Sequence, residues 1–171
     1  MDPRRRLFLR GALQQARAPE VAPPPRPPWA LHGEADFTAR CTRCGDCVRA
    51  CPRSLLSPGD GGFPQIRFDT QGCSLCGDCR AACPTGALSR EPDAPAFRWR
   101  VRIADHCLAQ RQVECRLCGD ACDTKALRFV PARGGISQLQ VQLDACTGCG
   151  DCVAPCPVNA IEMALPTLET P

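Results

Sequence analysis

Apolar side chains follow a strand-like alternation only over short segments of this chain. In the clearest segment, residues 97–103, arginines alternate with Phe97, Trp99, Val101 and Ile103. This is the period of a half-buried strand. Further short strands are expected at residues 64–69, 87–89, 126–130 and 139–143. Because Gly134 and Gly135 lie between the last two, a turn is expected to join them. The pattern predicts an α+β fold of short strands and short helices.

The N-terminal residues have a different character. Residues 1–28 carry six arginines and end in a Pro-rich run, residues 23–28. Such a run favours an extended polyproline II tether. Before it, six apolar residues allow either a short basic amphipathic helix or a disordered tail: Leu7, Phe8, Leu9, Ala12, Leu13 and Ala16. Short helices are marginal in water, so both alternatives stay open.

The composition limits how much hydrophobic core the chain can build. Of its 171 residues 44% are hydrophobic only when its 16 cysteines are counted, and there are two Trp and no Tyr. Small domains with weak cores need metals or cross-links. A break at residues 91–95 suggests three parts, which are a tail at 1–32, a first domain at 33–92 and a second domain at 93–171.

Repeated cysteine runs divide the chain further. Three runs have the spacing C-x2-C-x2-C-x3-C-P, and they comprise Cys41, Cys44, Cys47 and Cys51; Cys73, Cys76, Cys79 and Cys83; and Cys146, Cys149, Cys152 and Cys156. This is the bacterial ferredoxin spacing that ligates a 4Fe-4S cluster. Three neighbouring thiolates can bind three irons of a compact cluster, and the fourth cysteine ligates the other cluster of a pair.

A fourth, altered run comprises Cys107, Cys115, Cys118 and Cys122, with Asp123 in place of the proline. Its downstream sequence, residues 122–127, parallels residues 83–88, so Cys118 is aligned as the third cysteine and Cys122 as the fourth. An insertion within residues 108–114 then separates Cys107 from Cys115. This insertion is either a partner surface or a tolerated loop.

The alignment predicts four 4Fe-4S clusters that together use all sixteen cysteines. With the fourth cysteines exchanged within each domain, the ligand sets are Cys41, Cys44, Cys47 and Cys83; Cys73, Cys76, Cys79 and Cys51; Cys107, Cys115, Cys118 and Cys156; and Cys146, Cys149, Cys152 and Cys122. Each fourth cysteine is expected to begin about one helical turn. The alternatives are all-cysteine zinc sites, which usually combine two separated C-x2-C pairs, and a disulfide scaffold.

Charge and hydropathy exclude some classes of partner. The formal charge of +3 gives no case for nucleic acid, and four oxidised clusters would bring the holoprotein to about −5. No stretch approaches the roughly 20 apolar residues of a transmembrane segment. The Arg4-Arg5-Arg6 start is similar to a twin-arginine signal, but no apolar region follows it, which predicts a cytoplasmic protein. Asp46, Asp78 and Asp151, which lie between predicted ligands, are expected to face water or to cap turns.

Several of these features together resemble the NapF family, ferredoxin-type accessory proteins of periplasmic nitrate reductase systems. They are the Arg-Arg start, Pro27-Pro28-Trp29, Cys41-Thr42-Arg43-Cys44, Gly61-Gly62-Phe63-Pro64 and the altered run at Cys107 and Cys115. The resemblance implies tandem bacterial-type 2x(4Fe-4S) ferredoxin-like domains in a cytoplasmic protein. It also implies contact with the precursor of the nitrate reductase catalytic subunit, NapA, before export.

The functional hypothesis is therefore a maturation factor that is not an enzyme. It would supply clusters, electrons or both to NapA. The alternative is an electron-transfer polyferredoxin that feeds a redox enzyme. A related periplasmic ferredoxin is a third possibility, if the Arg-Arg motif acts as a signal.

Overall fold

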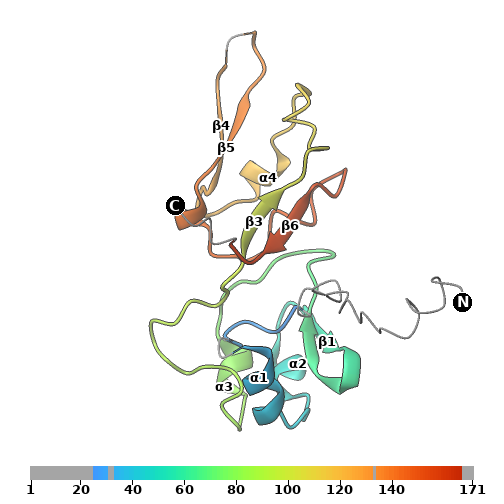
Figure 1. Cartoon of the computed structure of the whole chain (residues 1–171), viewed down its shortest axis with the longest axis vertical. Coiled ribbons are helices and arrows are strands. Elements are labelled where there is room, and N and C mark those ends of the chain that lie inside the picture. The colour runs from blue at the N-terminus through green and yellow to red at the C-terminus, as the bar shows by residue number, and fades with distance from the viewer. Residues whose placement is uncertain (1–24, 31–32, 133, 167–171) are drawn as a thin grey trace, which may run out of the picture.

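The computed structural model describes residues 25–30, 33–132 and 134–166. The expected amphipathic helix and the start of the Pro-rich run lie outside these residues. Figure 1 shows two groups of elements, with α1 to α3 and β1 at one end of the molecule and α4 with β3 to β6 at the other. None of the helices in the described part of the chain has the length and apolar character needed to cross a membrane.

The first half contains one small hairpin and several short helices. Its elements in order are α1 Glu34–Arg40, α2 Asp46–Ala50, β1 Leu56–Pro58, the 3-10 turn η2 Asp60–Gly62, β2 Pro64–Ile66 and α3 Asp78–Ala81. β1 and β2 are antiparallel, with Leu56 opposite Ile66. The strand predicted at residues 64–69 therefore forms, but it ends at Ile66.

The prediction of a strand at residues 87–89 is wrong. These residues form no ladder, although Ala87, Leu88 and Ser89 are all buried. They lie against the segment that contains Trp29, and the Ser89 N–H donates to the Trp29 carbonyl at 2.9 Å. Their apolar character reflects burial in a core, which periodicity cannot distinguish from a buried strand.

The second half consists mainly of two antiparallel pairs of strands. Its elements are β3 Arg100–Ile103, α4 Leu117–Asp120, β4 Leu127–Val130, β5 Gln138–Val141, the 3-10 turn η3 Leu143–Ala145 and β6 Ile161–Ala164. β3 pairs with β6, and β4 pairs with β5 to form a hairpin that projects from this half in Figure 1. The strands predicted at 97–103, 126–130 and 139–143 are confirmed in shorter form, and β6 was not foreseen.

Helices α2, α3 and α4 lie before the fourth cysteines, which the sequence did not predict. The expected single turn that begins at the fourth cysteine forms in three motifs, where the N–H groups of Ser54, Lys125 and Asn159 donate to the carbonyls of Cys51, Cys122 and Cys156. α2 ends at Ala50, and Cys51 is extended at φ −77° and ψ 111°. The proline that follows disfavours helical geometry in the residue before it. The third cysteine of a motif is the second residue of each of these three helices, as Cys47 in α2, Cys79 in α3 and Cys118 in α4. The equivalent place of Cys118 agrees with its alignment as a third cysteine.

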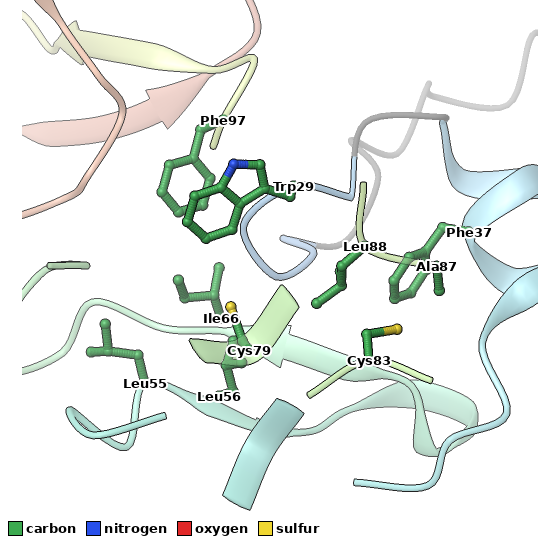
Figure 2. Packing of buried hydrophobic residues seen from close by; sticks show 10 residues of the cluster. All are labelled: Trp29, Phe37, Leu55, Leu56, Ile66, Cys79, Cys83, Ala87, Leu88 and Phe97. Carbon is green, nitrogen blue, oxygen red and sulfur yellow. The ribbon is translucent and has the colours of Figure 1, made fainter. Parts of the chain in front are cut away.

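The core of the first half includes residues from the predicted tail. Trp29 is buried, its N–H donates to the Ala96 carbonyl, and its indole Nε1 donates to the Ala94 carbonyl at 3.2 Å. Figure 2 shows ten buried side chains of this core: Trp29, Phe37, Leu55, Leu56, Ile66, Cys79, Cys83, Ala87, Leu88 and Phe97. Residues 25–30 are thus packed on the first half instead of serving as a free tether. Phe97 joins the same core, although the sequence suggested the second domain for it.

The second half has a smaller core around its two strand pairs. It contains Val101, Cys118, Leu127, Cys152 and Ile161. α4 packs closely on β4, because a Cβ at Gly119 would lie 2.8 Å from the Phe129 ring. Two cysteines among five buried residues show how small the aliphatic part of this core is.

Replacing a buried leucine of this core is expected to be costly. Leu127→Ala removes a side chain that is only 2% exposed, and we expect the free energy of unfolding to fall by about 2 to 5 kcal/mol. Leu143→Ala, at a position 47% exposed, is the matched control and should change it by less than about 0.5 kcal/mol. Denaturant titration of anaerobically prepared protein, followed by circular dichroism, measures both. Equal losses for the two variants would contradict the assignment of this core.

Candidate metal centres

Four cysteines from two different motifs surround a cavity in the first half. Cys41, Cys44 and Cys47 come from the first motif, and Cys83 comes from the second. Phe37 and Leu88 contribute apolar walls to this cavity. Figure 2 shows Cys83 among these apolar side chains. The arrangement matches the first predicted ligand set.

A second cavity in the first half is lined by the reciprocal set. Cys73, Cys76 and Cys79 come from the second motif and Cys51 from the first. Leu56 and Ile66 line the same cavity, and Figure 2 shows the Cys79 side chain next to them. The two motifs of this half therefore exchange their fourth cysteines, as the spacing predicted.

The altered motif forms a cavity of the same kind. This cavity is lined by Cys107, Cys115, Cys118 and Cys156. The insertion between the first two cysteines folds into a compact turn, in which the Arg111 N–H donates to the Cys107 carbonyl at 3.1 Å and the Val113 N–H to the Leu108 carbonyl at 2.9 Å. Ala109 is buried against Cys107 and Ala160. This turn places Cys107 at the same cavity as Cys115 and Cys118.

The remaining four cysteines also lie together. Burial, together with the charges of the neighbouring cysteines, raises the pKa of Cys152 to about 12; these neighbours are Cys149, Cys146, Cys118 and Cys122. Three of these neighbours belong with Cys152 to the fourth predicted set. The influence of Cys118 shows that the two cysteine groups of the second half lie near each other.

Burial and mutual repulsion oppose ionisation of the thiols at the centre of each group. Burial, together with charges on neighbouring cysteines, raises the pKa of Cys47, Cys73 and Cys118 to about 11 and that of Cys79 to about 12. Metal ligation requires thiolates. A cationic group must therefore compensate the charge of four thiolates in each of these places.

Hydrogen bonds to sulfur partly offset this penalty. Burial tends to raise the pKa of Cys83, but hydrogen bonds from the backbone of Leu88, Thr85 and Ala87 and from the Thr85 hydroxyl outweigh it, so the pKa falls below its usual value. The Thr124 hydroxyl lies 3.6 Å from the Cys122 sulfur in the same way. Both threonines stand two residues after a fourth cysteine, a signal in the sequence that the cysteine spacing alone does not reveal. Such bonds tune the reduction potential of a bound cluster.

The loops that carry the cysteines curve through glycines in the left-handed region. Gly45 and Gly77 follow the second cysteine of their motifs and have φ of 77° and 85°. Each lies directly before a helix, so the third cysteine is turned back toward the first two. Glycine adopts this conformation without the cost that a side chain brings.

The chemistry of these groups favours an iron-sulfur cluster over the alternatives. All sixteen cysteines carry free thiols, so a disulfide scaffold is not the arrangement found. Within residues 25–30, 33–132 and 134–166, no three His, Cys, Asp or Glu side chains are placed to hold a single metal ion. A cubane needs no such group, because each thiolate binds a different iron.

Asp151 has a role that differs from its expected one. It was expected to face water or cap a turn, but its Oδ1 accepts a hydrogen bond from the Gly72 N–H at 2.9 Å and lies 3.2 Å from Nη1 of Arg53. Both partners belong to the first half. Asp46 instead pairs locally with Arg49, and Asp78 is exposed.

Comparison with known proteins gives a family match to both halves. The sequence profile of the 4Fe-4S dicluster domain matches residues 40–87 and 113–160, which together make up more than half of the chain. The second match begins after Cys107, so the profile does not cover the displaced first cysteine of the altered motif. The structure, in contrast, places Cys107 beside Cys115 and Cys118. The chain therefore has two 4Fe-4S dicluster domains.

Relatives with similarity over most of the chain are ferredoxin-type proteins. The chain is 46% identical to ferredoxin-type protein NapF of Haemophilus influenzae over 93% of this chain and 92% of the relative. It is 40% identical to ferredoxin-type protein NapF of Escherichia coli K12 over 80% of this chain and 82% of the relative. It is 34% identical to ferredoxin-type protein NapG of Haemophilus influenzae over 87% of this chain and 61% of the relative.

Cluster assembly should become less favourable as the pH falls. Thiols with a pKa of about 12, as at Cys79 and Cys152, are protonated near neutral pH, so iron must displace their protons, and each displacement costs more free energy as the pH falls. We expect reconstitution from iron and sulfide under anaerobic conditions to be several-fold weaker at about pH 6.5 than at about pH 8.5. Visible absorbance of the bound clusters measures this, with free iron and sulfide held constant as a control. Equal assembly at both pH values would show that protonation does not compete with iron.

Proposed function

Because the chain belongs to the NapF family of ferredoxin-type proteins, we propose that it is a cytoplasmic iron-sulfur accessory protein with four 4Fe-4S clusters that assists maturation of NapA before export. The observation that supports this best is the gathering of sixteen free cysteines into four groups of four, each drawn from two motifs. Both the number of clusters and the role of each cysteine belong to this proposal.

The residues present fit such clusters. Three of the groups line cavities with apolar walls. The clusters would supply one-electron transfer. The chain would hold them through thiolates, adjust their potentials through N–H and hydroxyl groups directed at sulfur, and shield them from water with residues such as Phe37, Ile66 and Phe129.

The proposed role is not enzymatic. The clusters would occupy the cavities with apolar walls, because the cysteines themselves line these cavities. A protein of this kind can give a partner electrons, or it can give up a cluster. Either step would assist assembly or reduction of an iron-sulfur centre in the NapA precursor, the partner implied by the family resemblance.

An electron-transfer polyferredoxin feeding a redox enzyme is the second candidate. It is favoured by one contact between the halves, in which the Cys73 N–H donates to the Cys149 carbonyl at 2.7 Å. This contact joins a cysteine loop of each half. Nitrate reductase purified from cells that lack this protein would separate the candidates, since a normal cluster content with a starved electron supply favours the carrier.

Crossed ligation can be tested by the reactivity of the released thiols. In Cys51→Ala, we expect Cys73, Cys76 and Cys79 to become open to alkylation, while Cys41, Cys44 and Cys47 stay protected. Cys83→Ala is the matched control and should give the reverse pattern. Mass spectrometry after anaerobic alkylation identifies the labelled thiols. Labelling of Cys41, Cys44 and Cys47 in the Cys51→Ala variant would contradict the exchange of fourth cysteines.

Partner binding can be tested by co-purification. Tagged protein with intact clusters is expected to capture the NapA precursor from the cytoplasm, and the Cys51→Ala variant serves as a cluster-deficient control. Capture of an unrelated redox enzyme in place of the precursor would contradict the maturation role and would support the second candidate.

A further inference from the structure

The two halves meet at the loops of the second and fourth cysteine motifs. The Cys73 N–H donates to the Cys149 carbonyl at 2.7 Å, so the backbone of one loop is hydrogen-bonded to the backbone of the other. Gly72, which precedes Cys73, is buried. We refer to residues 72–73 and 148–151 as the joint.

A closed set of polar contacts surrounds Gly72 in the joint. Asp151 Oδ1 accepts the Gly72 N–H at 2.9 Å, and Arg53 Nη1 donates both to Asp151 Oδ1 at 3.2 Å and to the Gly72 carbonyl at 2.7 Å. The Arg53 and Asp151 side chains are 36% and 26% exposed, so the ion pair itself adds little to stability. Its geometry nevertheless fixes both polar groups of the Gly72 backbone.

Arg53 also connects the joint to a cysteine group. It lies two residues after Cys51, the fourth member of the group with Cys73, Cys76 and Cys79. Asp151 lies between Cys149 and Cys152 of the facing group. The contacts of Arg53 and Asp151 therefore join the two cysteine groups that would hold facing clusters.

Aromatic side chains pack the other side of the joint. Trp99 Nε1 donates to the Gly148 carbonyl at 2.8 Å, and a Cβ at Gly148 would lie 2.7 Å from the Trp99 ring. A Cβ at Gly150 would lie 2.5 Å from the Phe68 ring. Phe68 and Trp99 are in edge contact, with ring centroids 6.1 Å apart. The loop of the fourth motif therefore packs against Phe68 and Trp99, which lie on opposite sides of the predicted domain boundary.

A glycine is required at position 72 because the facing half approaches closely, and not because the backbone there is in the left-handed region. Its φ is not in the left-handed region, yet a Cβ there would lie 2.2 Å from the Asp151 nitrogen and 2.7 Å from the Cys149 carbonyl oxygen. The corresponding residues before the first cysteine of the other motifs carry side chains, and they are Arg40, His106 and Ala145. A cysteine loop therefore tolerates a side chain at this position, unless another loop packs against it.

We propose that Gly72 and Asp151 are positioning residues that hold the second and fourth motifs together, so that the clusters of these two motifs form the inner pair through which electrons cross between the halves. The inference rests on the proposed function, because it requires both clusters. In the crossing step one electron leaves the reduced cluster of one half and reduces the oxidised cluster of the other. No bond forms or breaks, and no proton is transferred.

Two variants test the joint in the intact holoprotein. Gly72→Ala introduces one methyl group where the two loops touch, and Asp151→Ala removes the acceptor of the Gly72 N–H. Asp78→Ala is the matched control, because Asp78 occupies the same motif position but is exposed. Iron and sulfide content is measured first, and a wild-type protein without four clusters would contradict the proposed function before any variants are compared.

The readout is spin–spin interaction in the electron paramagnetic resonance spectrum of the reduced protein. With cluster content unchanged, we expect Gly72→Ala and Asp151→Ala to lose the part of this interaction that arises between the halves, and Asp78→Ala to keep the wild-type spectrum. Wild-type spectra in all three fully loaded variants would overturn the proposal. Loss of clusters in both joint variants would also overturn it, because the joint would then be needed to hold clusters and not to pair them.

Discussion

The structure depends on bringing four thiols from two distant motifs into one desolvated place. Burial and neighbouring thiols raise the pKa of Cys79 and Cys152 to about 12. Forming several thiolates in one place is therefore unfavourable unless iron compensates their charge. The hydrophobic cores are small, and several of their members are cysteines. On our account, metal–thiolate bonds therefore supply cohesion that larger proteins obtain from aliphatic side chains.

Spacing along the chain was enough to find three of the four cysteine runs, and the fourth also needed the parallel between residues 122–127 and residues 83–88. The alignment of Cys118 and Cys122 agrees with the position of α4, and the strands at 100–103, 127–130 and 138–141 follow the alternation seen in the sequence. Local pattern failed at residues 87–89, where non-local packing decides the conformation, and it did not predict helices α2, α3 and α4 before the fourth cysteines.

The joint could not have been predicted from one sequence. Gly72 is an ordinary glycine until the facing loop is known, and Asp151 occurs in the same Gly-Asp-Cys context as Asp46 and Asp78. Only the placement of the two halves distinguishes it, through its contacts with Gly72 and Arg53. The role of Trp29 was hidden in a similar way, since a Pro-rich neighbourhood suggests an extended tether, whereas tertiary packing buries this side chain in the first core.

Dependence of the fold on iron is the central claim, and removal of iron tests it most directly. Anaerobically purified protein would be treated with a strong iron chelator while visible absorbance and far-ultraviolet circular dichroism are recorded together. The account predicts that cluster absorbance and secondary structure are lost in parallel, and that both return when iron and sulfide are restored. Protein that loses its iron but keeps its secondary structure and cooperative unfolding would contradict it.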